Sequence, residues 1–160
     1  MILIDVALYK DRAYFIIFDG EVKRFPVELS ERELMDWVRR TPCIVERDFT
    51  TEKVREGISI QYGFKFVRKL TDEEVNELLN EYGDDYTAYL KGRYIYLEHP
   101  ILKRTFRIKY NYSLNAYRLY QEFQKGIPKY IKIRALGRVV HNEFLSGLIY
   151  KVVEAVEVIP

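Results

Sequence analysis

The start of the chain alternates between short apolar runs and polar breaks. Residues 2 to 9 and 13 to 18 are dense in isoleucine, valine and aromatic side chains, and the polar residues between them predict a hairpin turn. Asp19 and Gly20 mark a second tight turn, which leads into residues 21 to 27. This pattern predicts three consecutive antiparallel strands.

Helix-initiation signals follow at three places. Ser30 and Glu33 form a capping-box pair ahead of apolar residues at helical spacing, which predicts a first helix. Thr71 stands before an acidic turn, whose charge suits the positive end of a helix dipole. Ser113 opens a third helical pattern, and Gly126 predicts where it stops. We therefore expect three helices that begin at these caps.

The segments between the helices mostly have strand patterns. Residues 43 to 46 are mostly apolar, and residues 63 to 70 alternate between apolar and polar, so both segments predict strands. The pattern of residues 51 to 57, which lie between these two segments, predicts a further short helix. Residues 93 to 98 and 104 to 110 predict another hairpin.

The C-terminal part is ambiguous. Residues 129 to 140 have no decisive period, and residues 142 to 158 fit either one helix or a helix to residue 150 followed by a strand. Taken together, the elements predict an α+β or α/β fold, with a mixed β-sheet and helices. The length of 160 residues favours a single domain over residues 1–160.

The composition of the chain excludes several classes of protein. The one cysteine, Cys43, lies in an apolar run and suits a core position, and without a Cys/His cluster a zinc framework is excluded. A single cysteine cannot form an internal disulfide, so we expect a protein of the reducing cytoplasm. The chain also has no apolar stretch of membrane-spanning length. A charged content of 31% is typical of thermophile proteins. Motifs of phosphate loops, serine hydrolases and zinc proteases do not occur.

Charge is divided unevenly along the chain. Residues 101–139 carry ten Lys or Arg and one acid, whereas residues 1–100 carry fifteen basic and twenty acidic side chains. The net charge of +2 thus combines an acidic part over 1–100, a basic, aromatic-rich segment over 101–139 and a C-terminal part over 140–160. A cationic surface with aromatic platforms suits a polyanion whose bases can stack.

We therefore expect this segment to bind nucleic acid, DNA or RNA. The predicted contacts are basic residues spread over the segment: Arg104, Arg107, Lys109, Arg118, Lys129, Lys132 and Arg134. Two alternatives use the same residues. The segment can be a solvated basic face whose aromatics point into the core, or a surface that docks an acidic protein partner.

Acidic residues in the predicted strands suggest a metal site. Asp5 lies inside an otherwise apolar strand, where a carboxylate is costly unless something binds it, and Glu46 closes the strand at 43 to 46. The order of three strands, helix, strand, helix, strand resembles the RNase H-like fold, and the Ile-Val-Glu ending at Glu46 is similar to an acidic motif of RuvC-type nucleases. His141 and Glu143 are the nearest match to a third acidic motif.

The resemblance implies an RNase H-like N-terminal half and a Mg²⁺-dependent endonuclease. Its metal ligands would be Asp5, Glu46 and Glu143, with Asp48 competing with Glu46 and His141 serving as a base or phosphate contact. Structural roles remain open for the same residues, since Asp5 can face solvent from an antiparallel strand and Glu143 can be a helix N-terminal acid. A non-catalytic DNA- or RNA-binding subunit of a replication, repair or defence complex is the alternative function.

Overall fold

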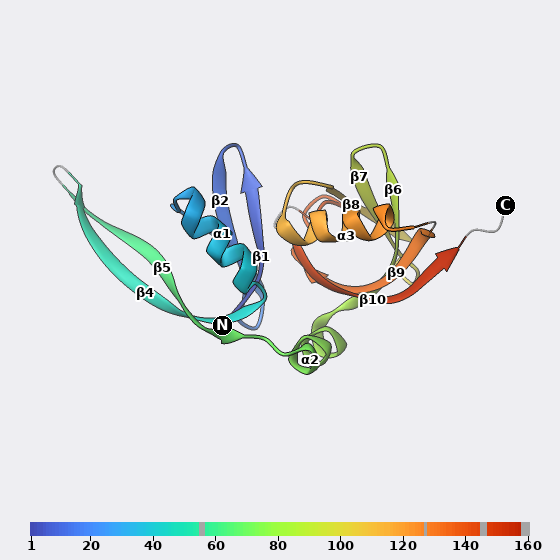
Figure 1. The fold of residues 1–160 in the computed structure, drawn as a ribbon, viewed down its shortest axis with the longest axis horizontal. Helices are drawn as coiled ribbons and strands as arrows, with labels where there is room; N and C mark the ends of the chain where they lie inside the picture. The colour runs from blue at the N-terminus through green and yellow to red at the C-terminus, as the bar shows by residue number, and fades with distance from the viewer. Residues whose placement is uncertain (55–56, 127, 145–146, 158–160) are drawn as a thin grey trace.

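The computed structural model of the chain describes residues 1–54, 57–126, 128–144 and 147–157. Within these residues the fold consists of two antiparallel five-stranded sheets and three helices (Figure 1). One sheet is built from the first half of the chain and the other from the second half.

The N-terminal sheet has the strand order β3-β2-β1-β4-β5. Its strands are β1 (Ile2–Tyr9), β2 (Arg12–Phe18), β3 (Val22–Val27), β4 (Cys43–Val54) and β5 (Gly57–Lys69). The three strands predicted at the start of the chain are confirmed as the meander of β1, β2 and β3.

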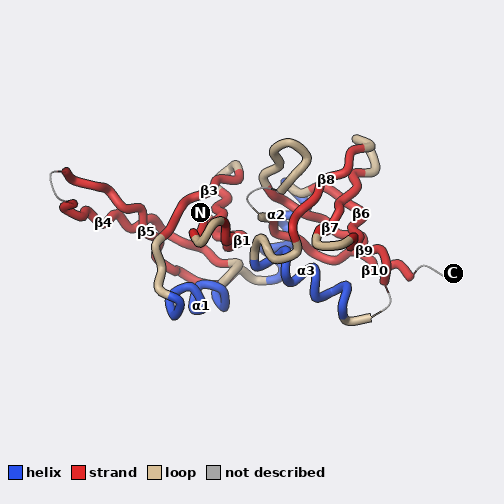
Figure 2. Tube along the Cα trace, turned by 90° about the horizontal axis from the view of Figure 1, so that it is seen from above, coloured by secondary structure: helices blue, strands red, loops and turns tan. Residues whose placement is uncertain are grey.

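A long hairpin of β4 and β5 projects from this sheet (Figures 1 and 2). Of β4, Ile44 and Cys43 pair with β1, so the rest of the hairpin runs beyond the other strands. The helix predicted over residues 51 to 57 is wrong, because residues 51–54 pair along β5 as strand. Residues 55 and 56 of that prediction lie outside the described residues.

The C-terminal sheet has the strand order β10-β9-β6-β7-β8. Its strands are β6 (Asp84–Lys91), β7 (Tyr94–His99), β8 (Arg104–Lys109), β9 (Pro128–Gly137) and β10 (Leu148–Glu157). The hairpin predicted around residue 100 is confirmed as β7 and β8. The helix predicted from residue 142 is wrong in the described part: His141 and Asn142 form a turn with positive φ, and β10 begins soon after.

The three helices are α1 (Glu31–Arg40), α2 (Asp72–Tyr82) and α3 (Leu114–Gln124), and each begins at the predicted cap. The Ser30 and Thr71 hydroxyls accept the backbone N–H three residues on, and a glutamate at that position completes each capping box. Ser113 accepts the N–H of Ala116 at 3.1 Å. Helix starts are thus set by local polar chemistry.

The fold is mainly β, so the predicted α+β or α/β class with an RNase H-like mixed sheet is wrong. In the N-terminal sheet β4 runs antiparallel to β1, and β5 follows β4 through a hairpin rather than a helix. Every other strand pairing between the described strands is also antiparallel. The β-branched residues between positions 43 and 69 favour strands, and this preference is stronger than the weak helix signal of residues 51 to 57.

Among the described residues, no helix covers much of one face of the C-terminal sheet. Alternate side chains of β6 to β9 form a core with α3, in which Leu119 and Ile133 are nearly or completely buried. On the opposite face α2 packs beside Leu136 and Ile149, in a core shared with the N-terminal sheet. The rest of this opposite face holds the candidate site.

Candidate nucleic-acid interface

A row of tyrosines crosses the outer face of the C-terminal sheet. Tyr89 of β6 lies directly opposite Tyr96 of β7, and Tyr96 lies opposite Arg107 of β8. On the other side, the ring of Tyr130 of β9 contacts the Tyr89 ring at a centroid distance of 6.0 Å. One line of side chains over four adjacent strands therefore consists of Tyr130, Tyr89, Tyr96 and Arg107. We call this line the tyrosine row.

The row exists because strand side chains alternate between the two faces of a sheet. Tyr86 and Ala88 of β6 point into the core with α3, so Tyr89 points to the opposite face. The same alternation on β7 buries Ile95 and Leu97 and places Tyr96 outside. The row residues remain accessible: Tyr130 is 40% exposed, and Tyr89 and Tyr96 are partly exposed.

Ring contacts hold the row in a defined geometry. The Tyr89 and Tyr96 rings are stacked at 5.4 Å with an interplanar angle of 11°. Partial burial, followed by the negative charge of Glu98 and the neighbouring tyrosines, raises the pKa of Tyr89. Stacked rings that stand on a rigid sheet are pre-ordered, which lowers the entropy cost of adding another flat group.

A second line of residues runs beside the row. Lys91 of β6 lies opposite Tyr94 of β7, and Tyr94 lies opposite Lys109 of β8. The Arg107 guanidinium sits 4.5 Å from the centre of the Tyr94 ring and links the two lines. Lys91 and Lys109 are exposed. The face therefore offers aromatic rings flanked by cations.

Acidic neighbours reduce the charge of the predicted basic segment. Arg107 binds Glu143 with a shortest contact of 2.7 Å, and Arg134 binds Asp85 at 2.7 Å. Lys132 lies 3.7 Å from Glu154. These acids lie outside residues 101–139. The net positive charge of the face is therefore smaller than the charge of that segment alone indicates.

The remaining predicted contacts belong neither to the tyrosine row nor to the line beside it. Arg104 donates to the Asn142 side chain at 2.7 Å at the start of β8, and Lys129 is exposed near the start of β9. Arg118 of α3 donates to the backbone carbonyls of Val38 and Thr41, at the C-terminal end of α1. Arg118 thus joins the two halves of the molecule.

Asp5 is completely buried at the junction of the two sheets. Its carboxylate accepts backbone N–H groups of Val6 at 2.9 Å, Asn115 at 3.0 Å and Leu148 at 2.9 Å, as well as a hydrogen bond from the Ser113 side chain. Burial raises the pKa of Asp5 to about 7, although these hydrogen bonds oppose the rise. Asp5 thus ties β1 to the start of α3 and the start of β10.

Asn115 completes this junction. Its side-chain amide donates to the carbonyls of Ile4 at 2.7 Å and Leu148 at 2.8 Å, and its oxygen accepts from Arg118 at 3.2 Å. Among the described residues, every fully buried side-chain nitrogen or oxygen has a hydrogen-bond partner. The junction is a satisfied polar network inside the protein.

We expect Gly147→Ala to lower the free energy of unfolding by about 2 to 4 kcal/mol. Gly147 has a φ of +99°, and an added Cβ would collide with the Asp5 carboxylate. Chemical denaturation of the variant measures the loss. Gly92→Ala is the matched control, since Gly92 also has a positive φ of +62° but opens onto empty space. Equal losses in the two variants would contradict the tight contact at Asp5.

The structure does not assemble the predicted acidic residues into one site. Asp5 is buried among backbone N–H groups, Glu143 binds Arg107, and Glu46 and Asp48 lie exposed on β4. His141 is exposed in the turn before Glu143. In the part of the chain that the structure describes, no three His, Cys, Asp or Glu residues are grouped to hold a metal ion.

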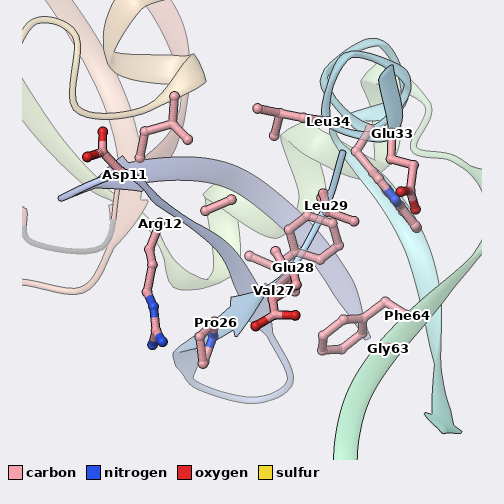
Figure 3. Close-up of a pocket in the computed structure, with 14 residues that line it drawn as sticks. Asp11, Arg12, Pro26, Val27, Glu28, Leu29, Glu33, Leu34, Gly63 and Phe64 are labelled. Carbon is pink, nitrogen blue, oxygen red and sulfur yellow. The ribbon is translucent and has the colours of Figure 1, made fainter. Parts of the chain in front are cut away.

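A groove of about 750 Å³ lies on the N-terminal half, between α1 and the strands (Figure 3). Apolar residues such as Leu29, Leu34 and Phe64 line it. Its charged lining residues are three acids and one base: Asp11, Glu28, Glu33 and Arg12. This balance disfavours a polyanion in this groove.

Two of the four members of the tyrosine row, Tyr89 and Tyr96, were not predicted from the sequence as site residues. Tyr89, Tyr94 and Tyr96 precede the basic segment, and β6 was not predicted as a strand. A signal was present, because Tyr94 and Tyr96 alternate with Ile95 and Leu97. Such alternation places the tyrosines together on one face of a strand. Tyr130 belongs to the aromatic-rich segment 101–139, and its ring contacts Tyr89 on the outer face.

No family model matches the sequence, and comparisons with curated proteins and with solved structures give no match. None of the helices in the described residues is long and apolar enough to cross a membrane. Evidence on function therefore comes from the residues of the tyrosine row and their surroundings.

Proposed function

We propose that the protein binds single-stranded nucleic acid on the outer face of the C-terminal sheet. The observation that carries the proposal is the tyrosine row, three tyrosines and an arginine in line over four adjacent strands. Aromatic side chains on a sheet bind unpaired bases by stacking, and each stacked base contributes about 1 to 3 kcal/mol.

Single strands suit this surface better than duplexes do. The bases of a duplex are stacked on each other, so tyrosine rings cannot reach their faces. A surface that binds duplexes makes many phosphate contacts through free cations. Arg107, Lys132 and Arg134 each form an ion pair with an acid, which reduces the positive charge that they offer to phosphates. The row therefore favours unpaired bases, with the exposed Lys91 and Lys109 placed to contact phosphates.

Binding without cleavage is the activity that the geometry supports. Phosphodiester cleavage by two metal ions requires carboxylates that converge on one point. Asp5 accepts four hydrogen bonds inside the protein, and the carboxylate of Glu143 is held by Arg107. We therefore assign Asp5 to the junction of the sheets and Glu143 to the placement of Arg107.

We expect a moderate dependence of binding on salt. If about three phosphates are contacted, the slope of log K against log salt for a single strand is about −2, which corresponds to roughly a 15-fold loss of affinity between ~50 and ~200 mM salt. Fluorescence anisotropy with a labelled oligothymidylate measures this slope. A slope near zero would contradict phosphate contact, and a slope steeper than about −5 would show that charge rather than stacking dominates.

A further inference from the structure

A cleft of about 1010 Å³ adjoins the tyrosine row at the edge of the C-terminal sheet. One wall comes from the turn between β1 and β2 together with β3, and the other from β8 and the segment after it. The cleft thus lies where the two halves of the protein meet. Its volume is sufficient for a nucleotide, since pockets for small ligands span about 300 to 1,000 Å³.

The lining of the cleft is net positive. Lys10 and Arg24 contribute from the N-terminal half and Arg107 and Lys109 from β8, whereas the acids of the lining are Asp11 and Glu143. The balance of four cations and two acids leaves two positive charges, which matches a terminal phosphate with a charge near −2 better than an internal phosphodiester.

Aromatic contacts hold the cations of the N-terminal wall. The Arg24 guanidinium lies 4.6 Å from the centre of the Tyr14 ring and hydrogen-bonds the Tyr112 side chain. The Lys10 ammonium lies 5.3 Å from the centre of the Tyr9 ring. Tyr9 and Tyr112 in turn contact each other at 6.1 Å. Cations fixed in this way lose little entropy when an anion binds.

The cleft is continuous with the tyrosine row. Tyr94 and Arg107 line the cleft, and the Tyr94 ring lies 6.5 Å from the Tyr96 ring of the row. Arg107 also hydrogen-bonds the Tyr96 side chain. A strand whose bases follow the row from β9 to β8 therefore arrives at the cleft.

We infer that the cleft binds the phosphorylated end of the strand that lies on the tyrosine row. This inference rests on the proposed function and adds that the protein prefers strands with a terminal phosphate. Arg24 and Arg107 grip the phosphate from opposite walls, and Lys10 and Lys109 complete its charge neutralisation.

The test compares oligothymidylates of equal length that carry a 5′-phosphate, a 3′-phosphate or hydroxyls at both ends. With the wild-type protein, we expect one of the phosphorylated strands to bind about tenfold more tightly than the hydroxyl strand. In the double variant K10Q/R24Q the ratio of the affinities for the phosphorylated and hydroxyl strands falls to about one. Lys125→Gln, at the exposed residue that follows α3, is the control for loss of one exposed charge and should keep the preference.

The outcomes separate this inference from the proposed function. Equal binding of all three strands overturns the inference and leaves the proposed function standing. If no strand binds, the proposed function fails, and thymidine 3′,5′-bisphosphate then tests whether the cleft by itself binds a phosphate group. Its titration, followed by NMR, should shift the amide signals of Lys10 and Lys109, and unchanged signals at millimolar ligand overturn the inference.

Discussion

Asp5→Asn is expected to lower the free energy of unfolding by about 4 kcal/mol at pH 5, because the new amide nitrogen cannot accept the hydrogen bonds that reach the buried carboxyl group. Backbone N–H groups from Val6, Asn115 and Leu148 converge there. At least one of these donors, or the Ser113 hydroxyl, would be left without an acceptor in a dry site. Urea denaturation of both proteins measures the difference.

The loss should depend on pH. The pKa of Asp5 is raised from 3.8 to about 7 in the folded state, so the folded protein binds this proton more tightly than the unfolded chain. The stability contributed by this group is fully present below about pH 4 and is lost as pH rises through about 7. The difference between wild type and Asp5→Asn should therefore shrink by about 2.5 kcal/mol from pH 5 to pH 8.

Asp48→Asn is the matched control, since Asp48 is an exposed acid on β4. We expect it to leave stability within about 0.5 kcal/mol of wild type at both pH values. An Asp5→Asn protein as stable as wild type would contradict the structural role assigned to Asp5. A loss of stability that does not vary with pH would contradict the raised pKa.

The double variant Y89A/Y96A is expected to weaken the binding of single-stranded oligothymidylate by about a hundredfold. Each ring removed costs about 1 to 3 kcal/mol of base stacking, and the two rings act together in one stack. Fluorescence anisotropy at fixed salt measures the change. The sheet should remain folded, because a cross-strand aromatic pair contributes only about 0.2 to 1 kcal/mol to stability.

Two controls accompany this variant. Y89F/Y96F keeps both rings and should retain binding within a few-fold, which separates stacking from the hydroxyl groups. Tyr117→Ala removes an exposed tyrosine from α3, the helix that packs on the opposite face of the sheet. If Tyr117→Ala weakens binding as much as the double variant does, the assignment of the face is wrong.

Local signals in the sequence predicted the elements that local chemistry decides. The three helix caps were correct, since Ser30, Thr71 and Ser113 each bond a backbone N–H three residues away. The strands on either side of the tight turns at residues 10 to 12 and 19 to 20 were also predicted. The hairpin of β4 and β5 was missed because its pairing depends on a partner strand rather than on its own period.

The candidate site was predictable only in part. The sequence pointed to basic and aromatic residues near the C-terminal half, and Arg107, Lys109, Lys132 and Arg134 do lie on the outer face. It could not show that Glu143, Glu154 and Asp85 would neutralise three of them, because those contacts join different strands. Asp5 was rightly singled out as an unusual buried acid. Its partners, however, are backbone groups of distant residues, which no sequence motif marks.

The most direct test of the proposed function is an NMR titration of the wild-type protein with unlabelled oligothymidylate at low salt. The account predicts that amide signals along the tyrosine row, at Tyr89, Tyr96, Arg107 and Tyr130, shift together as the strand binds. The signals of α1 and of the groove beside it should stay in place. Unchanged signals along the row at millimolar oligonucleotide, or shifts confined to α1, would contradict the account.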